Sequence, residues 1–127
     1  MRSQQEIFDI VVDHLYKQGR PSMIDGTCSY ISEDGCMCAV GVLIPDEVYD
    51  KDMEGKVVVC LLKYKNLPKE FYVSEYSSLL YDLQYCHDGC RCFDNGKFDL
   101  YDLTARLSLT AKKYDLQFKA KILPLIN

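Results

Sequence analysis

Three segments with apolar residues at helical spacing do most to limit the folds open to this chain. They span residues 3–19, 74–88 and 99–114. Each begins at a serine or an aspartate, whose side-chain oxygen can accept the N–H groups that a first helical turn leaves without partners. In the first segment, Ser3 and Glu6 also have the spacing of a capping box. The sequence therefore predicts three amphipathic helices, each with one apolar face to bury.

The long segment between the first two helices predicts one small β-hairpin. Residues 27–32 and 38–44 are short and rich in strand-tolerant side chains, and Glu33-Asp34-Gly35 between them is typical of a turn. A short helix is expected to start at Pro45 and to end before Asp50, because proline suits the first turn of a helix.

Residues 56–64 fit two kinds of structure. The β-branched run at 57–59 favours a strand, whereas Val58, Leu61 and Leu62 have helical spacing, and we favour a helix. The predicted fold class is α+β, a mainly helical single globular domain over residues 1–127 with one small antiparallel β-hairpin. An apolar C-terminal extension is expected at 118–127.

Composition and charge narrow the classes of partner. A chain of 127 residues with 48% hydrophobic and 27% charged residues suits one folded domain with a real core. Its net charge of -4 argues against nucleic acid or an anionic membrane as the main partner, because both attract a positive surface. Residues 1–13 lack the apolar run of a signal peptide, and no run approaches a membrane span. We therefore expect a cytoplasmic protein.

Seven cysteines stand mostly in two clusters. The first contains Cys28, Cys36 and Cys38, and the second is Cys86-His87-Asp88-Gly89-Cys90-Arg91-Cys92. Because a reducing compartment keeps thiols reduced, we expect no disulfides. The seventh cysteine, Cys60, lies in an apolar run and is expected to be buried as a small hydrophobic side chain.

A zinc site is one hypothesis for these clusters. Zinc would need thiolates and imidazole at one tetrahedral point, and the candidate ligands are Cys28, Cys38, His87 and Cys90. The Cys-x-Cys spacings are tighter than the usual zinc knuckles, which argues against it. The alternative is that these are ordinary buried thiols, so that the protein has no cofactor.

A thiol active site is a second hypothesis. It would pair Cys28 or Cys38 as nucleophile with His87 as base. A structural role for His87, tying the end of its helix to the hairpin, is an equally good interpretation. His14 lies on the apolar face of the first helix, where a packed histidine with one backbone hydrogen bond is expected.

A protein-binding surface is the third hypothesis. The chain has ten tyrosines and no tryptophan, and tyrosine is enriched at binding surfaces. An acidic run accompanies them, and the sequence lacks the glycine-rich phosphate-binding motifs of nucleotide enzymes. The candidate partner-binding residues are Asp46, Glu47, Tyr49, Tyr72, Tyr76, Tyr81 and Tyr85.

Several motifs resemble a family of short proteins from bacteriophages, prophages and some bacteria. They are Cys28-Ser29-Tyr30, the run from Cys38 to Tyr49 (Cys-Ala-Val-Gly-Val-Leu-Ile-Pro-Asp-Glu-Val-Tyr), Met53-Glu54-Gly55-Lys56, Leu83-Gln84 and His87-Asp88. The resemblance implies a phage or prophage setting and no particular activity. The chain departs from the family pattern at Cys36, Cys86, Cys90 and Cys92 and in its apolar tail.

The shared cysteines and histidine weaken the zinc hypothesis. Cys28, Cys38 and His87 number one fewer than a closed structural zinc site needs, although three ligands suffice for an open catalytic site. We favour the interpretation that they form a packed contact between hairpin and helix.

The sequence therefore predicts a small non-enzymatic binding protein of phage or prophage origin. It would act in the host cytoplasm and inhibit a host protein, with a component of antiviral defence as the expected target, by occupying its surface. The first alternative is a small zinc-dependent or cysteine-thiol enzyme that uses Cys28, Cys38 and His87. The second is a sponge for a small signalling molecule, although no basic cluster that would bind a phosphate is evident.

Overall fold

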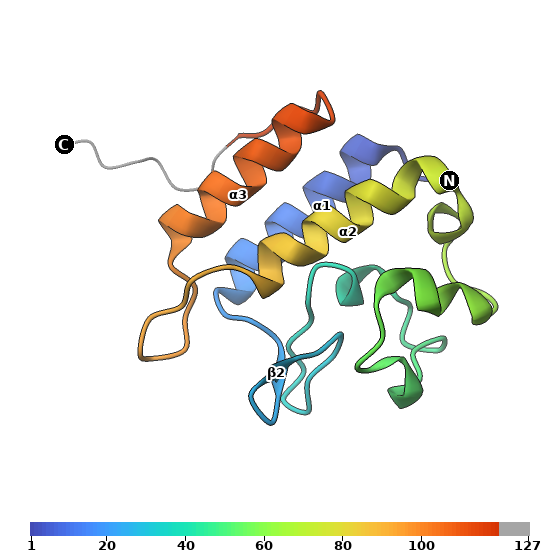
Figure 1. The fold of residues 1–127 in the computed structure, drawn as a ribbon, viewed down its shortest axis with the longest axis horizontal. Helices are drawn as coiled ribbons and strands as arrows, with labels where there is room; N and C mark the ends of the chain where they lie inside the picture. The colour runs from blue at the N-terminus through green and yellow to red at the C-terminus, as the bar shows by residue number, and fades with distance from the viewer. Residues whose placement is uncertain (120–127) are drawn as a thin grey trace.

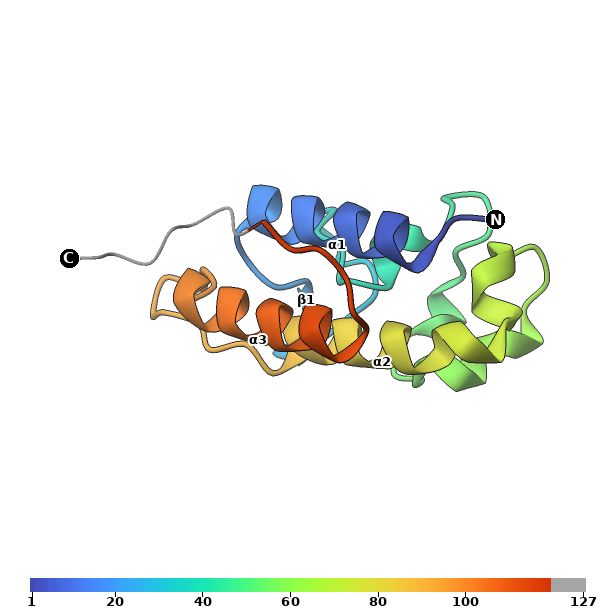
Figure 2. The ribbon, with the colours of Figure 1, turned by 90° about the horizontal axis from the view of Figure 1, so that it is seen from above.

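Three long helices form the body of the protein (Figure 1). The computed structural model describes residues 1–119, and the helices are α1 (Gln4–Gln18), α2 (Ser74–Asp88) and α3 (Leu100–Lys113). Helix α3 runs antiparallel to α2 (Figure 1), and α1 forms a second layer that packs on both and runs roughly alongside α2, as the view from above shows (Figure 2). The three predicted helices are thereby confirmed, and the fold is a mainly helical α+β domain.

Helix α1 begins and ends as its sequence predicts. The Ser3 hydroxyl accepts the N–H of Glu6, and the Glu6 carboxylate accepts the N–H of Ser3, which completes a capping box. Gly19 ends the helix with a φ of 72°, a left-handed conformation that glycine adopts without strain. The buried face of the helix consists of Ile7, Phe8, Val11, Val12 and Leu15.

The β-hairpin lies earlier in the chain than predicted. Strand β1 (Met23–Ile24) pairs antiparallel with β2 (Thr27–Cys28). Asp25 and Gly26 form the turn between them, and both have positive φ, as a two-residue hairpin turn of this kind requires. The sequence pattern suggested strands at 27–32 and 38–44 because both runs tolerate extended structure.

The hairpin predicted at 27–32 and 38–44 is wrong except for one isolated bridge between Ile31 and Met37. Residues 38–41 are all buried, whereas a strand at a sheet surface would expose every second side chain. From Gly41 to Leu43 the chain instead forms a short 3-10 helix, η1.

The remainder of this segment consists of turns and short 3-10 helices. The helix expected after Pro45 is wrong, because only one turn forms there, with the N–H groups of Val48 and Tyr49 both donating to the Pro45 carbonyl. The helix favoured at 56–64 is confirmed as the 3-10 helix η3 (Val58–Lys63). Helix η2 (Lys51–Met53) precedes η3 along the chain, and η4 (Lys69–Tyr72) follows it.

One cysteine prediction is also wrong. Cys60 is exposed, because the 3-10 helix η3 buries Val58 and Leu61 and turns the residues between them outward. The apolar character of the run therefore does not reflect complete burial. Its neighbours Val57 and Val59 remain 59% and 67% exposed.

The C-terminal extension begins by folding back on α1. The ring of Phe118 packs edge-to-face on that of Phe8, with 5.6 Å between the ring centres. The rest of the predicted extension, 120–127, lies outside the described residues. Within residues 1–119, no helix is both long and apolar enough to cross a bilayer.

Candidate functional site

Two adjoining pockets lie between α2 and the chain at residues 54–62. The first has a volume of about 380 Å³ and the second about 500 Å³. Both are lined by Val57, Val58 and Tyr81, so they adjoin, and we call the two pockets together the α2 groove. Residues 54–62 line one side and residues 77–88 of α2 the other, and residues 27–30, Phe71 and Lys113 complete the lining. The groove combines an apolar rim with polar groups at one end.

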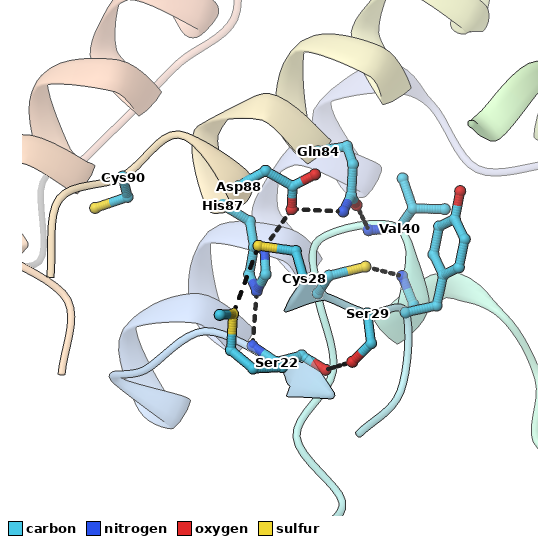
Figure 3. Close-up of polar contacts among 12 residues, drawn as sticks. Ser22, Cys28, Ser29, Val40, Gln84, His87, Asp88 and Cys90 are labelled. Carbon is cyan, nitrogen blue, oxygen red and sulfur yellow. Dashed lines mark hydrogen bonds and ion pairs between the residues drawn. The ribbon is translucent and has the colours of Figure 1, made fainter. Parts of the chain in front are cut away.

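Cys28, His87 and Asp88 meet at the polar end of the groove (Figure 3). One ligand atom from each lies within 4.8 Å of the others, and this is the only such His, Cys, Asp or Glu group among residues 1–119. Strand β2 supplies the cysteine, and the last turn of α2 supplies the other two. The structure thus brings Cys28 of the first cysteine-rich cluster together with His87 and Asp88 of the second.

The His87 ring is a buried link between two parts of the chain. Its Nδ1 lies 2.7 Å from Asp88 Oδ1, and its Nε2 accepts the backbone N–H of Ser22 at 2.9 Å (Figure 3). Asp88 Oδ1 also accepts from the Gln84 side chain at 3.0 Å. The Gln84 oxygen in turn accepts the N–H of Val40 at 3.0 Å. One continuous network therefore ties the end of α2 to Ser22 and Val40 in the long segment between α1 and α2.

The hydrogen bonds of His87 assign its tautomer. A backbone N–H can only donate, so Nε2 presents its lone pair to Ser22 and Nδ1 carries the proton that Asp88 accepts. Neither ring nitrogen is then open to bind a metal or to take a proton from a thiol. These contacts give His87 a structural role close to the predicted one, because they tie the end of α2 to Ser22, the residue just before the hairpin.

The thiols at this end are held in the protonated form. Burial, together with the nearby Asp88 carboxylate, raises the pKa of Cys28 to about 11. Burial raises the pKa of the fully buried Cys38 to about 12. The Cys28 thiol points to the Met23 sulfur at 3.7 Å, and the Cys38 sulfur accepts the Gly41 N–H at 3.2 Å. Nucleophilic catalysis needs a thiolate, which this environment disfavours.

The four zinc ligands suggested by the sequence do not converge. Cys90 lies apart from Cys28 and His87, beyond the end of α2, with its thiol towards the carbonyls of Arg91 and Asp99 (Figure 3). Cys38 is outside the group of Cys28, His87 and Asp88. Three donors, one of them a histidine with both nitrogens engaged, do not fit a closed structural zinc site.

Glu54 supports the opposite wall of the groove. Its two carboxylate oxygens accept the N–H groups of Tyr30 at 2.8 Å and Ile31 at 3.1 Å. The Tyr49 hydroxyl donates to the same carboxylate at 2.5 Å, so Tyr49, a predicted partner-binding residue, is half-buried in this local network. The sequence places Glu54 in the acidic run and in one of the family-like motifs, but it did not predict that Glu54 accepts these backbone N–H groups.

The predicted tyrosine cluster divides into two groups. Tyr81 and Tyr85 stand one turn apart on α2, are 61% and 59% exposed, and line the groove. Tyr76 is half-buried and donates to the Arg2 carbonyl at 2.8 Å. Tyr72 is 45% exposed, and its hydroxyl bonds the Tyr64 carbonyl at 2.5 Å. Only Tyr81 and Tyr85 of these four face the groove.

The acidic residues Asp46 and Glu47 are exposed but stand outside the groove. Their predicted contact with a partner stays a prediction. Val57, Val59 and Leu62 at the apolar rim were not predicted from the sequence as binding residues. The β-branched run was the available signal, since a helix formed there must expose some of its apolar residues.

The family-like run from Cys38 to Ile44 is packed rather than exposed. At Gly41 a β-carbon would lie 2.0 Å from the Tyr30 carbonyl oxygen, so only glycine fits. Cys38, Ala39 and Val40 beside it have no exposed surface. The motif therefore forms the core contact that seats this segment on the helices.

The fold and the groove define a class, a small mainly helical α+β domain with a partly apolar surface depression. Comparison of the chain with family models, curated proteins and solved structures finds no match.

Proposed function

We propose that this is a non-enzymatic binding protein that inhibits a host protein by occupying its surface through the α2 groove. The observation that carries the proposal is the exposed apolar rim. Val57, Val59, Leu62, Tyr81 and Tyr85 are all at least 36% exposed and surround two pockets. Apolar and tyrosine side chains around a depression are typical of protein-binding surfaces.

The chemistry beside the rim supports binding over catalysis. His87 uses both ring nitrogens in structural hydrogen bonds, and the Cys28 pKa of about 11 keeps its thiol protonated. A thiol enzyme that used these residues would first have to break the contact between Ser22 and His87. The convergence of Cys28, His87 and Asp88 is the one observation that favours this alternative.

A phage or prophage origin, action in the host cytoplasm and a target in antiviral defence belong to the same proposal. Their support is the resemblance of the motifs in residues 28–56 and 83–88 to short phage and prophage proteins. A sponge for an anionic signalling molecule has less support. The cations lining the two pockets are Lys56 and Lys113, and Lys113 is paired with Asp82 at 2.8 Å.

The test is capture of a partner by tagged protein from host lysate, with groove variants compared in parallel. Val59→Glu and Tyr81→Glu place a charge on the rim, whereas Phe93→Glu changes a side chain that is 56% exposed outside both pockets. The wild type and Phe93→Glu should retain the same host protein, and both groove variants should lose it. Retention by all variants, or no retained protein, contradicts the proposal.

A further inference from the structure

We infer that the first pocket of the α2 groove receives an arginine side chain of the protein partner. This inference rests on the proposed function and names the chemistry of the contact. Three features converge on a cation at this pocket: carboxylates, the end of a helix and exposed aromatic rings.

Negative charge gathers at the polar end of the pocket. Asp88 and Glu54 both line it, and Asp88 is also the last residue of α2. The C-terminus of a helix carries a partial negative charge, which adds to that of the carboxylate. The Gln84 amide and the His87 ring both contact Oδ1 of Asp88, and the other carboxylate oxygen points away from them (Figure 3).

The one cationic side chain among the lining residues is engaged elsewhere. Lys56 Nζ donates to the carbonyl oxygen of Asp52 at 2.5 Å. It therefore makes its contact with its own loop, outside the pocket lining. Glu54 adds negative charge to the pocket, but its oxygens already accept from Tyr30, Ile31 and Tyr49. Asp88 is therefore the carboxylate that would pair with the guanidinium.

Aromatic rings form the outer rim. Tyr81 and Tyr85 expose their rings at the pocket, and ring faces attract cations. The Arg106 guanidinium lies 5.5 Å from the centre of the Tyr85 ring, which steadies that ring and leaves Tyr81 as the main stacking surface. Guanidinium stacks on rings and pairs with carboxylates better than the more strongly hydrated lysine ammonium does.

The size and surroundings of the pocket suit one long side chain. A volume of about 380 Å³ is near the lower end for ligand pockets. The second pocket adjoins it across Val57, Val58 and Tyr81 and has an apolar rim. The partner segment is therefore an arginine with an apolar residue beside it.

The test uses two small probes and NMR. The ¹⁵N-labelled protein is titrated with N-acetyl-arginine methylamide and with the citrulline analogue, which has nearly the same shape and no charge. Arginine should shift the amide signals of residues 55–58 and 81–88 in a saturable way. The citrulline analogue should bind at least about tenfold more weakly than arginine, or not at all. Equal shifts from both probes, shifts outside the groove or no shifts would overturn the inference.

The Asp88→Asn variant tests whether the charge of Asp88 contributes to arginine binding. Asparagine keeps an oxygen that can accept from His87 and Gln84 but loses the charge, so the fold should be retained and arginine binding should weaken about fivefold or more. Unchanged arginine binding in a folded Asp88→Asn would contradict the inference. If this variant does not fold, the comparison of arginine with citrulline on the wild type still decides.

The arginine-binding test and the host-protein capture test can fail independently of each other. Failure of arginine to bind, while Val59→Glu still loses the host protein, removes the arginine assignment alone. Arginine binding together with partner capture that ignores the groove variants removes the proposed function.

Discussion

The backbone N–H of Ser22 donates to Nε2 of His87 at 2.9 Å, a contact between residues 65 positions apart. It joins the chain just before the hairpin to the last turn of α2. Gln84 and Glu54 act in the same way, because each accepts a backbone N–H from the irregular segment that follows α1. Polar side chains thus hold in place a segment with little regular hydrogen bonding of its own.

Removal of the His87 ring should strongly destabilise the protein. His87→Ala loses both ring hydrogen bonds and the edge-to-face contact with Phe98, whose ring centre is 5.8 Å away. We expect the free energy of unfolding in urea to fall by about 3 kcal/mol. His14→Ala is the control, since His14 is half-buried with one bond to the Met37 carbonyl. Equal losses in the two variants would argue against the role given to His87.

A methyl group at Gly41 should be much more costly than one at Gly35. Gly41→Ala would press its β-carbon into the Tyr30 carbonyl, so we expect a loss above about 3 kcal/mol or failure to fold. Gly35→Ala meets open space, and its positive φ of 88° alone should cost about 1–2 kcal/mol. Thermal unfolding of both variants makes the comparison. A mild effect at Gly41 would show that the segment packs differently.

The thiols should alkylate in an order set by exposure and pKa. At pH 8 a pKa of about 11 leaves roughly one Cys28 thiolate in a thousand, so iodoacetamide should modify the exposed Cys60 well before Cys28. The rate at Cys28 should rise about tenfold per pH unit while the protein stays folded. Mass spectrometry of timed samples gives the order. Modification of Cys28 first at neutral pH would instead support a thiol enzyme.

Stability should fall as the solution becomes acidic. Burial raises the pKa of Glu70, but bonds from the Arg2 backbone N–H at 2.7 Å and side chain at 3.1 Å outweigh it, and the net pKa is lowered. The N–H of Arg91 and then the Arg106 side chain lower the pKa of Asp102. A carboxyl group with a lowered folded-state pKa stabilises the fold above its unfolded-state pKa, and this contribution is lost as pH falls through the folded value.

Urea unfolding at pH 6, 4 and 3 measures this effect. The free energy of unfolding should decrease with each step, and Glu70→Gln should flatten the decrease because it removes one of the carboxyl groups with a lowered pKa. A slope that Glu70→Gln leaves unchanged would mean that the contact between Arg2 and Glu70 contributes little.

The helices were predictable because their signals are local. Caps at Ser3 and Asp99 and apolar spacing of three and four residues act within a few turns, so each helix is encoded in its own sequence. The hairpin was misplaced because residues 38–41 are buried by tertiary packing against the helices, which no local pattern reports. The turn Asp25-Gly26 was the local signal that could have placed it.

The candidate site was predictable only in part. Tyr81 and Tyr85 were expected at a binding surface, and their helical spacing places both on one side of α2. The approach of Cys28 to His87 depends on how the hairpin lies against the end of α2. Sequence offers the candidates for such a contact but not the distance between them. The exposed rim at Val57 and Val59 required the 3-10 geometry of η3.

The most direct test of the account is hydrogen–deuterium exchange of the protein alone and with its captured host partner. If the α2 groove binds the partner, exchange in the complex should slow at residues 54–62 and 77–88 and stay unchanged in the loop at 92–98. Protection confined to other parts of the chain, with no change along the groove, would contradict it.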